Sequence, residues 1–177
     1  MDFEVYDIFL RPMTLEDTDN IVSWRNSENV KKYFIYQNEF TKEGHLRWID
    51  TKVKTGEVVQ FIIVEKESNK PIGSVYLRDI DYEFHKAEYG IFIGEDCKKG
   101  KGYGTQAARL MIKYAFAELH LHRIYLRVYS DNERAINSYK KAGFMVEGLL
   151  KDDVLVRGKY RDIIWMGIIN ELDTGEE

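Results

Sequence analysis

The glycine-rich segment Lys99-Gly100-Lys101-Gly102-Tyr103-Gly104-Thr105 constrains this chain more than any other stretch of it. An apolar run, Tyr89–Ile93, precedes the segment, and an amphipathic stretch, Gln106–Leu119, follows it. A strand that ends in alternate glycines and continues as a helix presents backbone N–H groups at a helix N-terminus. These groups lack intrahelical partners, the helix dipole favours negative charge there, and glycine permits the positive φ that close contact requires. Because the segment also carries lysines, it predicts a ligand with a pyrophosphate group.

Two better-known nucleotide motifs do not fit this loop. A Walker loop continues Gly-Lys with Ser or Thr, whereas Gly102 follows Lys101 here. A dinucleotide fingerprint spaces its glycines as G-x-G-x-x-G, but this chain places them at positions 100, 102 and 104. On the loop alone, a purely structural turn therefore remains the alternative.

Length and composition restrict the class of protein. The 177 residues are 44% hydrophobic and 32% charged, as expected of one globular domain, which we place over residues 1–172 with a disordered tail at 173–177. The net charge of -4 argues against a nucleic-acid surface. The single cysteine, Cys97, excludes an intrachain disulfide and a cysteine-based zinc site, and we expect no metal. Without a membrane-spanning run or a signal-peptide pattern, a cytoplasmic protein with no membrane partner is expected.

The hydrophobic periodicity predicts a mixed α/β fold with one central sheet flanked by helices. A capping box at Thr14 and Asp17 begins a first helix. A second helix, over residues 41–54, is expected to bury Leu46, Ile49 and Val53. Further helices are expected at 106–119 and 133–141, and strands at 5–11, 60–65, 72–77, 87–93, 123–128, 144–147, 154–156 and 163–169.

A second motif makes the prediction specific. After the strand at 123–128 comes Asn132-Glu-Arg-Ala135-Ile-Asn-Ser-Tyr139-Lys-Lys-Ala-Gly143-Phe144. Together with the glycine loop, this order resembles the GNAT N-acetyltransferase superfamily, over nearly the whole chain from Leu10 to Met166. The chain departs from the family pattern at Lys99, where Gln or Arg is usual, and the effect is mild because the loop acts mainly through backbone amides.

The resemblance implies a fold, a co-substrate and a reaction. The GNAT fold is a mixed, mostly antiparallel sheet flanked by about four helices, and the family transfers acetyl groups from acetyl-CoA to amines. Tyr139 stands where the family supplies a hydroxyl to the departing CoA thiolate, and Asn132 where a side chain contacts CoA. The implied CoA contacts are Ile91, Ile93, Lys99, Gly100, Lys101, Gly102, Tyr103, Gly104, Thr105, Asn132 and Tyr139.

Each candidate also has a plain structural interpretation. Tyr139 could pack its ring in a helix, and Asn132 could cap the helix that starts at Glu133. Attack on a thioester requires a neutral amine, so a general base is expected. Glu88 is the first candidate for base or amine contact, with a solvated strand residue as the alternative, and His85 is the rival base.

The acceptor amine is less constrained. Arg157–Asp162 and Val146–Gly148 resemble spermidine and ribosomal-protein acetyltransferases, whereas Trp24-Arg25-Asn26 and His45-Leu46 resemble the amino-sugar acetyltransferases of the pseudaminic acid pathway. We expect a nucleotide-linked amino sugar as acceptor, contacted by Arg25, His45 and Glu88. The alternatives are a polyamine, a protein N-terminus and, in another class, a CoA-binding sensor without catalysis. Exposed strands are compatible with a homodimer.

Overall fold

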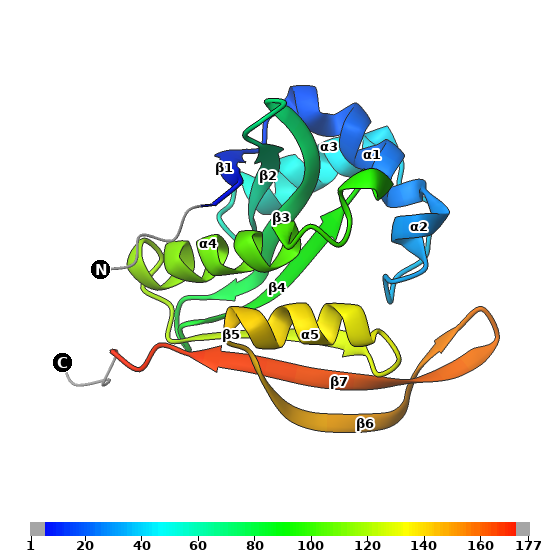
Figure 1. Ribbon diagram of the computed structural model, residues 1–177, viewed down its shortest axis with the longest axis vertical. Helices are drawn as coiled ribbons and strands as arrows, with labels where there is room; N and C mark the ends of the chain where they lie inside the picture. The colour runs from blue at the N-terminus through cyan, green and yellow to red at the C-terminus, as the bar shows by residue number, and fades with distance from the viewer. Residues whose placement is uncertain (1–5, 173–177) are drawn as a thin grey trace.

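The computed structural model describes residues 6–172, except the side chain of Cys97. A seven-stranded sheet runs through it in the order β1-β2-β3-β4-β5-β7-β6 (Figure 1). The strands are β1 (Ile8–Pro12), β2 (Val59–Glu65), β3 (Lys70–Asp81), β4 (Lys86–Ile93), β5 (Arg123–Tyr129), β6 (Met145–Val156) and β7 (Lys159–Ile169). The α-helices are α1 (Thr18–Asn26), α2 (Glu28–Lys31), α3 (Lys42–Trp48), α4 (Tyr103–Ala117) and α5 (Glu133–Ala142).

Helices cover both faces of the sheet. Side chains alternate along each strand, so a strand with apolar residues at successive positions has apolar side chains to bury on both faces. On β2, Ile63 packs in the cluster that contains Met111 of α4, while Ile62 and Val64 pack with Trp24 of α1. The helix α4 buries three alanines together with three larger side chains, Tyr103, Met111 and Ile112. The predicted mixed α/β fold, mostly antiparallel and with four helices of seven residues or more, is confirmed.

The strands β4 and β5 form the single parallel pair among the strands of residues 6–172, and they pair only briefly. Lys86–Glu88 faces Arg123–Tyr125, after which the ladder ends while both strands continue. Every other neighbouring pair of strands is antiparallel. We call this opening between β4 and β5 the fork. Beyond Glu88, β4 keeps its antiparallel partner β3 but has no partner on the side of β5.

Most expected elements are present, including the hairpin of β2 and β3 and the capping box, in which the Thr14 N–H donates to Asp17 at 2.8 Å. The expected helix at 41–54 instead changes from α3 to a π-helical turn at Ile49–Val53. The prediction that Leu46 is buried is wrong, because the inward stripe of the helix runs through His45 and Ile49, four residues apart. The expected tail at 173–177 and residue 5 of the first strand lie outside the described residues.

The C-terminal strands also differ from the expectation. The runs at 144–147 and 154–156 belong to one strand, β6, whose pairing with β7 shifts register twice. The shifts, between Val146 and Gly148 and between Leu150 and Val154, interrupt the alternation of side chains that a sequence pattern can detect. Over the described residues, no helix combines the length and apolar character needed to cross a membrane.

Gly94 offers a test of the packing on the α1 face. A Cβ at this position would lie 2.1–2.4 Å from ring carbons of Trp24, whose indole N–H is bonded to Glu95 at 3.1 Å. We expect Gly94→Ala to lower the free energy of unfolding by about 1–3 kcal/mol, the usual cost of overpacking. Urea denaturation measures this loss.

Gly148→Ala is the matched control, since a Cβ there meets nothing within 4 Å. Its unfolding free energy should stay within about 0.5 kcal/mol of the parent protein. Equal urea midpoints for both variants would contradict the packing described for Trp24.

Candidate active site

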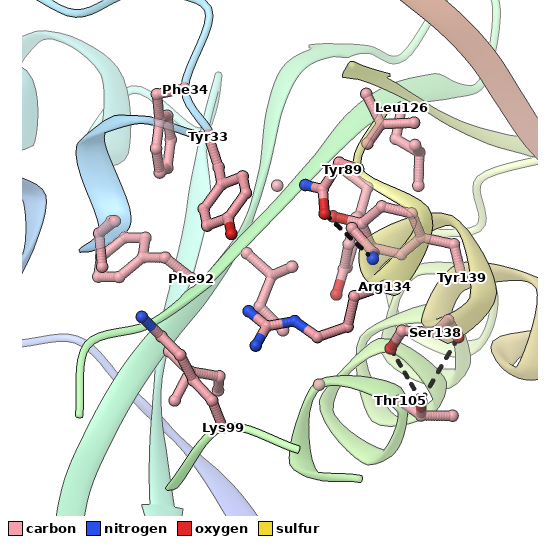
Figure 2. Close-up of a pocket in the computed structure, with 18 of the residues that line it drawn as sticks. Tyr33, Phe34, Tyr89, Phe92, Lys99, Thr105, Leu126, Arg134, Ser138 and Tyr139 are labelled. Carbon is pink, nitrogen blue, oxygen red and sulfur yellow. Dashed lines mark hydrogen bonds between the residues drawn. The ribbon is translucent and has the colours of Figure 1, made fainter. Parts of the chain in front are cut away.

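A cavity lies in the fork. Its volume is about 420 Å³, and residues from β3, β4, β5, α5, the glycine loop and the segment after α2 line it (Figure 2). Residues of the predicted site that line it are Glu88, Ile91, Ile93, Lys99, Gly100, Gly102, Tyr103, Gly104, Thr105, Asn132 and Tyr139. Lys101, Arg25 and His45 are not among the lining residues.

The glycine loop has the backbone that anion binding requires. Gly100 and Gly102 both adopt left-handed conformations, with φ of 82° and 81°, and Gly102 is the N-cap residue of α4. A Cβ at either position would meet no atom within 4 Å, so the space beside the loop is open. The first bond of this helix runs from the Gln106 N–H to the Gly102 carbonyl, which leaves the earlier N–H groups for a ligand. These features fit a pyrophosphate.

A buried carboxylate, Glu65, braces the loop, and the sequence pattern did not reveal it. Lys98 Nζ lies 2.6 and 2.8 Å from its two oxygens, Tyr103 donates its hydroxyl at 2.8 Å, and Ser68 donates at 2.6 Å. The bonds from Lys98, Ser68 and Tyr103 lower the pKa of Glu65 to about 2. The hydrogen bond from Tyr103 to Glu65 also raises the pKa of Tyr103 to about 12. Because Lys98 precedes Gly100 and Tyr103 follows Gly102, Glu65 holds the segment Gly100-Lys101-Gly102 from both sides.

Lys99 is held in place as well. Its ammonium forms an ion pair with Asp96 and donates to the Asn29 carbonyl at 3.2 Å. This contact joins the glycine loop to α2. The loop is thus fixed before any ligand arrives, which reduces the entropy lost on binding.

The helix α5 supplies the other wall of this half of the cavity (Figure 2). Asn132 caps it, accepting a bond from the Ala135 N–H at 3.3 Å, and also lines the cavity. Both interpretations of Asn132 are therefore compatible with its position. The hydroxyls of Thr105 and Ser138 lie 2.8 Å apart and connect α4 to α5.

Tyr139 sits in an aromatic cluster at the inner end of α5. Its ring packs edge-on against Tyr89 at 6.0 Å and against Phe144 at 6.0 Å. Burial, with a smaller contribution from Tyr76, raises the pKa of the Tyr139 hydroxyl above its ordinary value. The hydroxyl is therefore protonated at neutral pH and able to donate a hydrogen bond.

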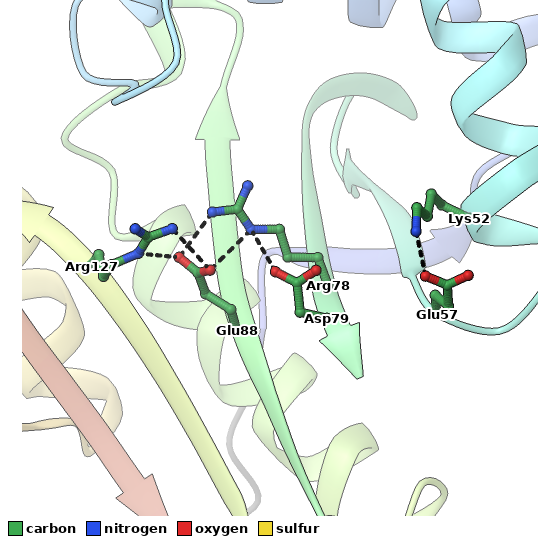
Figure 3. Close-up of polar contacts among 6 residues, drawn as sticks. All are labelled: Lys52, Glu57, Arg78, Asp79, Glu88 and Arg127. Carbon is green, nitrogen blue, oxygen red and sulfur yellow. Dashed lines mark hydrogen bonds and ion pairs between the residues drawn. The ribbon is translucent and has the colours of Figure 1, made fainter. Parts of the chain in front are cut away.

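Glu88 lies at the point of the fork between two arginines (Figure 3). Arg78 Nη2 and Arg127 Nε both lie 3.0 Å from its Oε1, and Arg78 Nε and Arg127 Nη2 both lie 3.2 Å from its Oε2. Burial raises the pKa of Glu88, but the bonds from Arg127 and Arg78 outweigh it, and the pKa lies below its ordinary value. We call these three residues the fork clamp.

The fork clamp changes the interpretation of Glu88. A general base needs a free lone pair and a pKa near the working pH. Oε2 of Glu88 already accepts two bonds, Oε1 accepts one and forms an ion pair with Arg78, and the pKa of Glu88 is lowered. The structure thus gives Glu88 the function of joining three strands and lends no support to its prediction as the base.

Arg25 and His45, expected to contact the acceptor, lie behind the cavity wall. The guanidinium carbon of Arg25 lies 3.3 Å from the ring centroid of Phe34, and burial lowers its pKa. His45 is buried with its Nδ1 3.2 Å from Thr18 Oγ1, and burial lowers its pKa too. The rival base His85 is exposed in the turn before β4 and outside the cavity lining, with its Nδ1 3.1 Å from the His120 carbonyl.

The segment after α2 closes the cavity opposite the glycine loop, and the C-terminal strands hold it. Tyr129 of β5 donates to the Phe34 carbonyl at 2.9 Å. Arg157, between β6 and β7, donates to Gln37 at 2.6 Å and to Glu28 at 2.7 Å. We call residues 33–37 the acceptor wall. Among the described residues, no group of three or more His, Asp, Glu or Cys side chains could hold a metal ion.

Comparison with known proteins gives one family. Residues 7–145 match the acetyltransferase (GNAT) domain family. Spermidine N(1)-acetyltransferase of Escherichia coli (strain K12) is 32% identical over 163 residues, which cover 92% of this chain and 86% of that protein. A putative ribosomal N-acetyltransferase of Bacillus subtilis is 32% identical over 105 residues, covering 59% of this chain and 57% of that protein.

Solved structures agree with the sequence matches. The crystal structure of spermidine N-acetyltransferase from Vibrio cholerae in complex with CoA and spermine superposes with a TM-score of 0.85 at 26% identity. The match covers 92% of this chain and 95% of that one. The pseudaminic acid resemblance is not supported by these comparisons.

Gly102 tests the anion cradle. Gly102→Val places a β-branched residue at a φ of 81°, which costs about 1–2 kcal/mol per residue for L-amino acids, and fills the open space beside the loop. We expect the dissociation constant of CoA to rise at least about tenfold, measured by calorimetry. Gly158→Val, at a φ of 76° outside the cavity, is the matched control and should leave CoA affinity unchanged. Unchanged affinity in both variants would refute the cradle.

Glu65 predicts a defined pH dependence of stability. Its pKa in the folded protein, about 2, lies below its ordinary value of 4.5. The stabilisation is therefore complete above about pH 4.5 and declines as the pH falls toward 2. We expect Glu65→Gln to be less stable than the parent protein at pH 7, with the difference shrinking between pH 4.5 and 3. Urea midpoints across that range measure it, and a difference that does not change with pH would contradict the prediction.

Proposed function

The chain belongs to the GNAT acetyltransferase family and is an N-acetyltransferase that uses acetyl-CoA, and from this premise we propose that it acetylates the primary amine of a small molecule by direct transfer. The observation that carries the proposal is the fork cavity, whose lining combines the glycine cradle and Tyr139 with polar side chains of β3, β4 and β5. No acyl-enzyme intermediate is needed, because both substrates can meet in the fork.

The alternation of β4 assigns a function to each side of the cavity. Tyr89 points to the α5 face, where it contacts Tyr139 and Phe144, and Glu88 points to the opposite face. The cradle and α5 therefore bind acetyl-CoA on the first face. Beyond Glu88, the edge of β4 toward β5 has free backbone groups, which suit the amides of the pantetheine arm. The second face receives the acceptor.

The transfer balances in bonds and protons. The neutral amine nitrogen attacks the thioester carbon, the C–N bond forms and the C–S bond breaks. Tyr139 donates its proton to the departing sulfur and regains one, through solvent, from the nitrogen as the amide forms. The products are the N-acetylated amine and CoA. Positioning the two substrates together supplies much of the acceleration, within a ceiling of roughly 7–11 kcal/mol.

The comparisons bear on the acceptor through relatives that are named for spermidine, an aliphatic amine. They support a polyamine better than the expected nucleotide-linked amino sugar, which no relative reported above supports. Because another relative is named as a putative ribosomal N-acetyltransferase, a protein N-terminus remains an alternative acceptor. A sensor without catalysis gains no support. The expected homodimer remains a prediction.

Tyr139→Phe tests the catalytic assignment, since it removes only the hydroxyl. We expect kcat to fall about 10²-fold, as for loss of a general acid, while the dissociation constant of acetyl-CoA stays within about twofold. Thiol release from acetyl-CoA is measured with a panel of polyamines, amino sugars and peptides. Tyr160→Phe is the control, because Tyr160 is exposed on β7 and outside the cavity. Unchanged turnover in Tyr139→Phe would refute the assignment.

A further inference from the structure

The acceptor chamber, on the face of the sheet opposite α5, has an unusual balance of charge. Its polar lining consists of Tyr33, Tyr36, Tyr76, Arg78, Glu88 and Arg127. These described lining residues contain two guanidinium groups and one carboxylate. The formal charge of the chamber is therefore +1.

The one carboxylate cannot bind a second cation. Both oxygens of Glu88 lie 3.0–3.2 Å from nitrogens of Arg78 and Arg127, and its side chain is only 7% exposed. A polyamine in this chamber would bring a second ammonium group against two arginines. Like charges so placed repel each other, and no free carboxylate among the lining residues offsets the repulsion.

The excess positive charge is also poorly solvated. The side chains of Arg78 and Arg127 are 24% and 20% exposed. Asp79, 3.8 Å from Arg78, is 73% exposed and not part of the lining. Behind the acceptor wall, the buried guanidinium of Arg25 adds positive potential near Arg78. A partly buried cation without a full partner attracts an anion more strongly than the same charge in water.

We propose that the acceptor carries an anionic group, a carboxylate or a phosphate, close to its reacting amine. The group binds the N–H groups of Arg78 and Arg127 that remain after their bonds to Glu88 and the bond of Arg127 to Tyr36, because each guanidinium has five N–H donors and gives Glu88 only two nitrogens. The tyrosine hydroxyls of the chamber add neutral donors. This inference rests on the proposed function for the reaction, and it favours an anionic amine over the polyamine that the names of the relatives support.

Matched amines that differ only in the distal group test it. The probes are 1,4-diaminobutane, 4-aminobutan-1-ol, 4-aminobutanoate and 4-aminobutyl phosphate. We expect kcat/KM for thiol release to be at least about tenfold higher with one of the two anions than with the diamine, with the alcohol between them. The better anion identifies carboxylate or phosphate as the group recognised. A diamine that matches or exceeds both anions overturns the proposal and leaves acetyl transfer to amines intact.

Binding separates this inference from the reaction itself. The same probes are titrated into the CoA-saturated protein by calorimetry. If an anion binds more tightly than the diamine but no probe causes thiol release from acetyl-CoA, the result would support the anionic acceptor and refute the proposed transfer. Absence of any difference between anion and diamine in both measurements overturns the inference.

Arg78→Gln locates the effect. It removes one charge but keeps an amide that can bond Glu88, so the advantage of the anion over the diamine should fall at least about tenfold while CoA affinity is retained. Arg161→Gln is the control, since Arg161 pairs with Asp131 outside the chamber. An unchanged advantage in Arg78→Gln, with circular dichroism showing a folded protein, would overturn the assignment of Arg78.

Discussion

The fork clamp is the interaction on which the cavity depends. Two parallel strands that pair over three residues and then separate would leave a weak junction, and Glu88 stands at its last paired position. From there it binds Arg78 on β3 and Arg127 on β5, so one carboxylate joins three neighbouring strands. Removing one partner of such a buried ion cluster leaves a charge without compensation, which is usually costly. The protein thus keeps an open sheet edge beside a rigid junction.

The fork also separates the residues proposed to bind acetyl-CoA from those proposed to bind the acceptor, through the alternation of side chains along β4. Neighbouring side chains point to opposite faces, so Glu88 and Tyr89 belong to different chambers although they are adjacent in sequence. One face presents backbone N–H groups and Tyr139, and the other presents arginines and tyrosines. The backbone of β4 lies between them, and the proposed function has the thioester arrive from one side and the amine from the other.

Local features of the site could be predicted from the sequence, and features made by distant residues could not. The glycine loop, the Asn132 cap and the position of Tyr139 follow from short-range rules, and the structure places them around one cavity. Arg127, 39 residues from Glu88, contacts it only because of the sheet register, which no local pattern contains. The same limit explains Glu65, whose partner Lys98 is 33 residues away. Arg25 and His45, expected at the acceptor, are not among the residues that line the cavity. Periodicity does not say which side of the sheet a helix covers.

The acceptor wall has a consequence for how the enzyme assembles itself. Its contacts run from Arg157 to Gln37 across 120 residues of chain, and from Tyr129 to Phe34 across 95. The glycine loop and α4 are consecutive in the chain. Contacts between distant residues form late, because the intervening chain must first be ordered. A folding molecule should therefore acquire the ability to hold CoA before it acquires the ability to select an amine, and the choice of acceptor is the last property of the native state to appear.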